Sequence, residues 1–172
     1  MSSTMENRAG FLPTLFQTGP DGRPEEVPLS SVSVLHEIFE RRVDADPEAV
    51  AVIFGGERST YGDLDQRANR LARHLRRRGV GSGSVVAILL PRSIDAYAGI
   101  LGILKSGAAY VPIDPEYPDD RIAFILEDSG AAAVVTTRGL AKRCGNFAGA
   151  IIRTDAESIA IDGESFERLT SQ

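Results

Sequence analysis

The chain has 172 residues, 42% of them hydrophobic and 25% charged, which is typical of an ordinary globular domain and argues against a disordered or fibrous chain. Its formal net charge of −5 argues against nucleic acid or an anionic membrane as a partner. Cys144 is the only cysteine, which excludes an internal disulfide and a cysteine-based metal site. No export signal and no apolar run of about 18 residues are present, so we expect a cytoplasmic protein.

The first 31 residues are rich in Ser, Gly, Pro and charge, and they have no sustained hydrophobic period. Pro20 and Pro24, together with neighbouring glycines, interrupt regular elements. We therefore predict a flexible leader or linker over residues 1–31 and a single domain segment over residues 32–172. The apolar side chains between residues 11 and 16 leave open an alternative, in which the leader docks on the domain or on a partner.

The first regular elements that the pattern predicts are a helix and a hairpin. Apolar residues recur at helical spacing over residues 34–43, with Ser33 as a candidate N-cap. A β-type run over residues 50–54 is followed by two glycines that suit a tight turn, and the chain then returns over residues 58–61. These two strands are expected to pair.

A long amphipathic helix comes next. Thr60 and Asp63 have the spacing of a capping box, and one apolar stripe continues from there to Gly79. Strands and helices then alternate: a strand at 85–90, a helix at 93–107, a strand at 110–113, a helix at 118–130, a strand at 132–136, a short helix at 139–143, a strand at 150–152, and a weakly patterned tail over 154–172.

The strands predicted at 85–90 and 132–136 are continuous apolar runs, which strands covered on both faces require. Single helices separate successive strands, and this order implies right-handed βαβ crossovers. The expected fold class is therefore α/β, with a mostly parallel sheet that is flanked by helices. Pro112 argues for a sheet edge or the end of a strand in the run 110–113.

Two segments resemble phosphate-binding loops but do not have the order or the spacing that such loops require. Gly79, Gly81 and Gly83 follow a helix and precede a strand, which is the reverse of the order that a nucleotide-binding loop needs. Lys105 precedes Gly107, whereas the lysine of a phosphate-binding P-loop follows the last glycine. We interpret both segments as helix ends.

Other polar residues also lack the neighbouring groups that metal binding or nucleophilic catalysis requires. His36 and His74 lie on separate predicted helices, without a Cys or carboxylate pattern at metal-ligand spacing. Ser59 and Ser93 have no base-and-acid set and no nucleophile-elbow sequence around them. The arginines of residues 73–78 are interpreted as a solvated cluster that stabilises a helix end. The candidate catalytic, cofactor-binding and metal-binding sets are therefore empty.

Two stretches carry a family resemblance. Residues 59–64, Ser-Thr-Tyr-Gly-Asp-Leu, resemble the first core motif of adenylation domains, L-T-Y-x-E-L, and residues 67–72 continue it. Residues 104–115 resemble the second motif, L-K-A-G-x-A-Y-V-P-x-D, with Ser106 in place of the usual alanine. The Tyr-Val-Pro form is similar to the nonribosomal peptide synthetase type rather than to acyl-CoA synthetases or luciferases. The resemblance covers residues 32–135.

The resemblance implies that the chain is an incomplete front part of the large adenylate-forming subdomain. The intact domain would use ATP and Mg²⁺ to convert an amino acid to an aminoacyl adenylate and would load it on a carrier protein. The family's phosphate loop, T-S-G-T-T-G-x-P-K-G, does not occur before Gln172. The expectation is therefore a scaffold fragment that has no cofactor of its own and is inactive alone.

The partners implied are the remainder of the adenylation domain or synthetase, and the resemblance also allows an MbtH-like accessory protein. We expect an exposed apolar surface where the remainder would pack. The alternative is a non-catalytic truncated module that binds an accessory or synthetase partner. An independent Rossmann-type protein is disfavoured because the dinucleotide fingerprint is absent.

Overall fold

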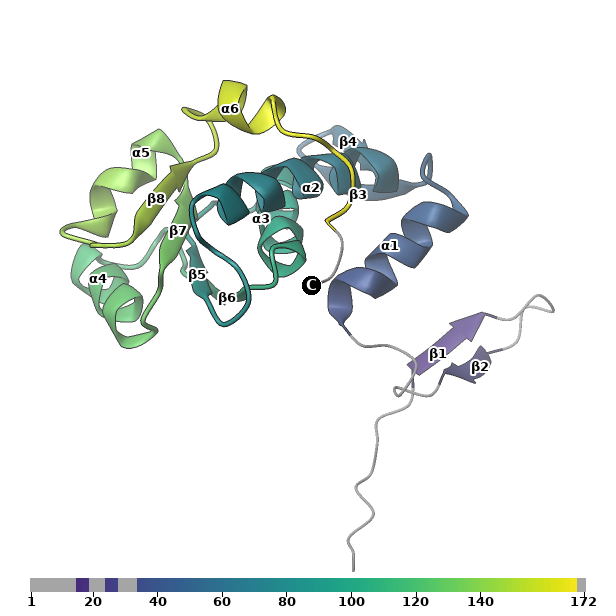
Figure 1. The fold of residues 1–172 in the computed structure, drawn as a ribbon, viewed down its shortest axis with the longest axis horizontal. Coiled ribbons are helices and arrows are strands. Elements are labelled where there is room, and N and C mark those ends of the chain that lie inside the picture. Colours follow the sequence, from purple (N-terminus) through teal and green to yellow (C-terminus); the bar gives the residue numbers. More distant parts are fainter. Residues whose placement is uncertain (1–14, 19–23, 28–33, 170–172) are drawn as a thin grey trace, which may run out of the picture.

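The structure, a computed structural model, describes residues 15–18, 24–27 and 34–169. Its regular elements alternate in type along most of the chain (Figure 1). They are β1 (Leu15–Thr18), β2 (Pro24–Val27), α1 (Leu35–Ala45), β3 (Val50–Phe54), β4 (Glu57–Thr60), α2 (Tyr61–Arg77), β5 (Val85–Ile88), α3 (Ile94–Lys105), β6 (Ala109–Pro112), α4 (Asp119–Asp128), β7 (Ala133–Thr136), α5 (Arg138–Ala141), the 3-10 helix η2 (Lys142–Cys144), β8 (Ala150–Arg153) and α6 (Ser158–Asp162).

The central sheet has the strand order β6-β5-β7-β8, and every pairing in it is parallel. Helix α3 therefore connects β5 to β6 on one side of it, and α4 connects β6 to β7 on the other side of β5. Pro112 lies in β6, which pairs only with β5 among the described strands, so the expected position at an edge is confirmed. The predicted α/β class with a parallel sheet is confirmed as well.

Helices cover both faces of this sheet, as Figure 1 shows. Val86 and Ile88 of β5 pack in one core with α2 and α3, whereas Ala87 and Leu89 pack in a second core with α4 and η2. Successive side chains of a strand point to opposite faces, so a strand that is covered on both sides needs an unbroken apolar run. Residues 86–90 and 133–136 are buried, whereas Val85 is half-buried and Ala132 exposed, so the prediction that the two runs are largely buried is confirmed.

Helix α2 begins as its sequence predicts. The Thr60 hydroxyl accepts from the Asp63 backbone N–H at 3.0 Å, and the Asp63 carboxylate accepts from the Thr60 N–H at 3.2 Å. These reciprocal bonds satisfy amide groups that have no partner within the helix. Further along, a Cβ on Gly102 of α3 would lie 3.0 Å from Leu71 of α2, so the glycine lets the two helices approach closely.

Helix α1 and the β3–β4 hairpin lie beside the α2–α3 layer. Gly55 and Gly56 turn the hairpin with φ angles of 60° and 88°, which confirms the tight turn. In α1 the N-cap position is Val34, which makes no side-chain cap hydrogen bond. The candidate cap Ser33 lies outside the described residues. Val43 is the only residue of α1 that is buried, so this helix is held less by apolar packing than α2 and α3 are.

Two features of the fold were not predicted from the sequence. Strands β1 and β2 pair antiparallel within residues 1–31, and Pro24, which was interpreted as a breaker, is the first residue of β2. The weakly patterned tail contains the short helix α6, after which an irregular segment crosses the face of α2 (Figure 1). The tail thus belongs to the folded unit.

Candidate functional site

The glycine-rich turn between α2 and β5 ends a helix, as expected. Gly79 and Gly83 have φ angles of 77° and 79°, and the Val80 N–H donates to the Leu75 carbonyl at 3.1 Å. The Gly79 conformation and the Val80 bond are those of a helix C-terminus, and Gly83 lies in the turn that enters β5. A phosphate binds to unpaired backbone N–H groups, which a helix has at its N-terminus. The N–H groups at a helix C-terminus are already hydrogen-bonded within the helix, so this turn does not form a phosphate site.

The second motif forms the joint between α3 and β6. Gly107 turns the chain with a φ of 87°, and the Ser106 hydroxyl donates to the Ile103 carbonyl at 2.7 Å. Beyond β6, the Arg143 guanidinium donates to the backbone carbonyls of Pro115 and Tyr117, and it also pairs with Asp119 at 2.7 Å. Arg143 of η2 therefore fixes the turn that follows the motif.

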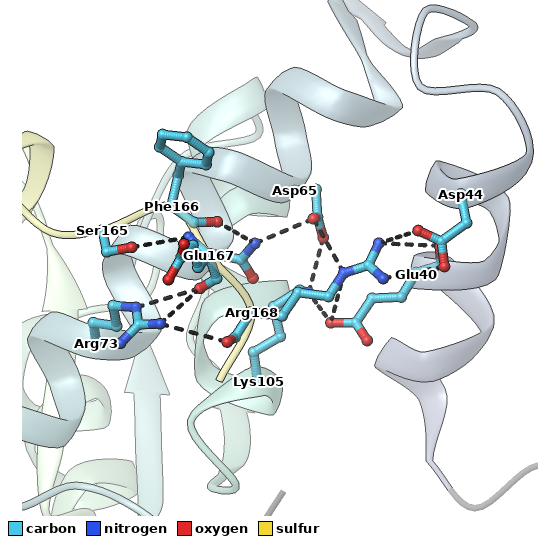
Figure 2. A network of polar contacts seen from close by, with 10 residues as sticks. Glu40, Asp44, Asp65, Arg73, Lys105, Ser165, Phe166, Glu167 and Arg168 are labelled. Carbon is cyan, nitrogen blue, oxygen red and sulfur yellow. Dashed lines mark hydrogen bonds and ion pairs between the residues drawn. The ribbon is translucent and has the colours of Figure 1, made fainter. Parts of the chain in front are cut away.

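Lys105 occupies the centre of a polar network that joins three helices (Figure 2). Its side chain is only 3% exposed, and its ammonium group pairs with Glu40 of α1 and with Asp65 of α2, the latter at 2.8 Å. A lysine with two carboxylate partners is neutralised within the fold and is not available to bind a phosphate. The lysine that superficially suggested a P-loop is therefore a structural cation.

Arg168 completes the network from the far end of the chain (Figure 2). Its guanidinium donates to both carboxylate oxygens of Asp44, at 2.8 and 3.1 Å, and to the Glu40 carbonyl at 3.3 Å. Its Nε lies 3.5 Å from the Asp65 carboxylate. The hydrogen bond from Arg168 lowers the pKa of Asp44, and the same bond raises the pKa of Arg168. Two cations thus face three carboxylates.

A second polar cluster surrounds Glu157, near the start of α6. One carboxylate oxygen lies 3.0 Å from His74 Nε2 and accepts from Arg78 at 2.6 Å, and the other accepts from the Arg153 N–H at 3.0 Å. Burial raises the pKa of Glu157, but the Arg153 and His74 hydrogen bonds and the charge of Arg78 outweigh it, so the net pKa is lowered. The cluster ties the end of α2 to the segment after β8.

This cluster predicts a pH-dependent effect of Glu157→Gln. The folded-state pKa is lowered, so the contribution of the ionised carboxylate is present above its unfolded pKa and is lost as the pH falls through the folded-state pKa. We expect the substitution to lower the free energy of unfolding by about 1–3 kcal/mol at pH 7, because it removes charge-assisted hydrogen bonds. Urea midpoints at pH 7, 5 and 3.5 should show the difference shrinking below a pH of about 4.3, the ordinary glutamate value. A constant difference would contradict this.

The arginines of residues 73–78 do more than complement the helix dipole. Arg77 and Arg78 pair with Glu164 and Glu157, and Arg73 donates to backbone carbonyls of the C-terminal segment. The interpretation as a solvated cluster was therefore incomplete. Their partners lie about 80 to 95 positions further along the chain, where the sequence gives no indication of them.

A hollow of about 560 Å³ lies where β7 and β8 end, lined by groups from α2, α3 and α6. Ligands of open α/β sheets bind at such carboxyl edges. Here Arg67 pairs with Asp95 at 3.1 Å, and Asp155 accepts from the Arg138 N–H at 2.8 Å. Arg70 lies over the Phe166 ring, and its buried Nε has no hydrogen-bond partner. The hollow therefore does not present a converging set of cations to a phosphate.

An apolar groove of about 770 Å³ lies between α1, the β3–β4 hairpin and α3. It leaves large side chains in contact with solvent: Leu35 is 61% exposed, Ile53 62% and Tyr97 50%. This exposed apolar surface lies beside α1, whereas the surface expected for the remainder of the domain stays a prediction. Among residues 15–18, 24–27 and 34–169, no group of three His, Cys, Asp or Glu side chains could hold a metal ion. In the same ranges, no helix is long and apolar enough to cross a membrane.

These elements define a class: an α/β domain segment with a parallel four-stranded sheet and helices on both faces. The family model of the AMP-binding enzymes matches residues 39–170, and the chain belongs to this family. Its relatives include bacitracin synthase 1 of Bacillus licheniformis, 47% identical over 137 residues, and tyrocidine synthase 2 of Brevibacillus parabrevis, 50% identical over 108 residues. The matches cover 80% and 63% of this chain but only 2% and 3% of these relatives.

Solved structures agree with the family. The nonribosomal peptide synthetase FmoA3 with bound alpha-methyl-L-serine-AMP superposes with a TM-score of 0.74 at 35% identity, over 81% of this chain and 16% of that chain. The N-terminal subdomain of Klebsiella oxytoca NpsA superposes with a TM-score of 0.70 at 25% identity, over 80% of this chain and 34% of that chain. The resemblance that the two motifs carried is confirmed.

Proposed function

We propose that this chain is the N-terminal scaffold part of an adenylation domain over residues 32–172, and that residues 1–31 are a leader. The intact domain would activate an amino acid with ATP to an aminoacyl adenylate and load it on a carrier protein in nonribosomal peptide synthesis. The observation that carries this proposal is the family match over residues 39–170, within a parallel sheet that superposes on synthetase structures. The remainder of the domain is the partner that the proposal requires.

The chemistry of the described residues supports a scaffold role. ATP and Mg²⁺ belong to the reaction of the intact family domain, but the described residues do not fit them. Lys105 and Arg168 are paired with carboxylates, and the glycine turns end helices or join strands. Adenylyl transfer depends on positioned cations and amides around the phosphates, and these have to come from other parts of the domain.

A chimera tests the proposal. Residues 32–172 would replace the matching segment in an adenylation domain of tyrocidine synthase 2, with that unaltered domain as the positive control. We expect the chimera to retain amino-acid-dependent exchange of pyrophosphate into ATP to within about tenfold, equivalent to about 1.4 kcal/mol of activation free energy. The 172-residue chain alone, assayed with all common amino acids and Mg²⁺, should show no exchange above a no-protein blank.

Two results would contradict the proposal. A folded chimera without exchange would show that these residues do not replace the scaffold of a working domain. Exchange by the 172-residue chain alone, lost when one amino acid is left out, would require a catalytic site within the chain. Circular dichroism of the chimera separates loss of function from loss of fold.

A further inference from the structure

The last described segment, residues 164–169, lies across one face of α2 and is here called the strap. Asn69 Nδ2 donates to the Phe166 carbonyl at 2.8 Å, and Arg73 donates to the Glu167 carbonyl at 3.1 Å. Arg77 pairs with Glu164, whose side chain is only 5% exposed, at 3.1 Å. Asn69, Arg73 and Arg77 are spaced by four residues, so they share one face of the helix. The strap is therefore attached along two turns of α2.

Beyond α2 the strap reaches α1 through a single side chain. Arg168 binds both carboxylate oxygens of Asp44 and the backbone carbonyl of Glu40, across 124 and 128 positions of sequence (Figure 2). A bidentate guanidinium–carboxylate pair fixes direction as well as distance. The orientation of α1 is thus connected to the strap rather than only to the helices beneath it.

The other attachments of α1 involve few buried side chains. The Phe39 ring lies 5.5 Å from the Tyr61 ring, and the Arg42 guanidinium lies 5.2 Å from the centroid of the same ring. Val43 is buried, and Phe39 packs against a small cluster that contains Leu64. The Lys105 ammonium group of α3 forms an ion pair with the Glu40 carboxylate. Towards its N-terminus the helix borders the apolar groove, where Leu35 is largely exposed. Few buried apolar contacts and exposed backbone are the features of segments that open before the whole protein unfolds.

We propose that the strap is an ionic latch that holds α1 against α2 and α3, and that it thereby controls how far the apolar groove beside α1 opens. With Arg168 in place, two cations face the carboxylates of Glu40, Asp44 and Asp65. Without it, Lys105 alone opposes three carboxylates, of which two are on α1 and one is on α2. Repulsion between like charges then favours movement of α1 away from α2.

Hydrogen exchange of the whole 172-residue chain tests the latch. In Arg168→Ala we expect the amides of α1 to exchange about tenfold faster or more, while those of β5 and β7 keep their wild-type rates. Fluorescence of 8-anilinonaphthalene sulfonate should increase, because the groove becomes more accessible to an apolar dye. Arg168→Lys should fall between wild type and Arg168→Ala, since a lysine retains the charge but cannot bind Asp44 through two fixed donors.

Two further variants make the test specific. Arg67→Ala removes an exposed arginine–aspartate pair between α2 and α3 and should leave α1 exchange unchanged. Asp44→Asn replaces the bidentate partner of Arg168 at a position whose side chain is 63% exposed. It leaves two cations facing two carboxylates, so it loosens the direct bond between the strap and α1 without adding repulsion. We therefore expect faster exchange confined to α1, by a smaller factor than in Arg168→Ala. Unchanged α1 exchange in both latch variants would overturn the proposal. Equal acceleration in α1, β5 and β7 would also overturn it, because the strap would then stabilise the whole fold and not α1.

Discussion

Lys105→Met is expected to lower the free energy of unfolding by about 3–5 kcal/mol, the range for breaking a buried ion pair from one side. The substitution keeps the length of the side chain but removes the charge that neutralises Glu40 and Asp65. The side chain of Asp65 is only 9% exposed and that of Glu40 19%, so solvent does not replace the lost cation. Urea unfolding followed by circular dichroism at pH 7 measures the loss.

Two controls separate charge from packing in this experiment. Lys142→Met makes the same change at an exposed position of η2 and should alter the stability by no more than about 0.5 kcal/mol. Adding Asp65→Asn to Lys105→Met should recover part of the loss, because one uncompensated carboxylate is removed. A loss for Lys105→Met no larger than for Lys142→Met would show that the network contributes nothing to stability.

The central sheet could be predicted from the sequence because its signals are local. The runs 85–90 and 132–136 are unbroken in their hydrophobicity, and the capping box of Thr60 and Asp63 defines where α2 begins. Each of these signals is complete within a few residues of the chain. The family motifs then added the synthetase class, which periodicity alone does not distinguish from other α/β domains.

The polar networks could not be predicted, because each joins residues that are distant in sequence. Glu40 and Lys105 are 65 positions apart, and Asp44 and Arg168 are 124 apart. One signal was available: Lys105 ends a helix that is otherwise largely apolar, and a lysine at a buried helix position needs a carboxylate partner. The sequence does not say which of the 24 acidic residues supplies it.

The tail was underestimated for a related reason. Residues 154–169 bury few apolar side chains of their own, so hydrophobic periodicity does not reveal that they are ordered. Their attachment is polar, through the side chains of Asn69 and Arg73 to backbone carbonyls. Any residue has a backbone carbonyl, so the sequence carries no mark of such a contact.

Ile103→Ala is expected to lower the free energy of unfolding by about 2–5 kcal/mol, the range for truncating a fully buried isoleucine. Ile103 is 0% exposed and lies where α3 packs on the sheet, in the core that contains Val86 and Leu75. Surrounding strands on one side and α2 on the other limit how far the cavity can collapse, so both lost transfer energy and cavity formation contribute. Urea midpoints with an unchanged m-value would report this loss.

The matched control is Ile53→Ala, the same truncation on β3 at a side chain that is 62% exposed in the apolar groove. It should change the free energy of unfolding by no more than about 0.5 kcal/mol, because most of the apolar surface that the truncation removes is already in contact with water in the folded state. Comparable losses for the two variants at low protein concentration would show that the groove is covered in solution. If the Ile53→Ala loss grew with protein concentration, a second copy of the chain would be what covers it, since binding to the native state stabilises by mass action.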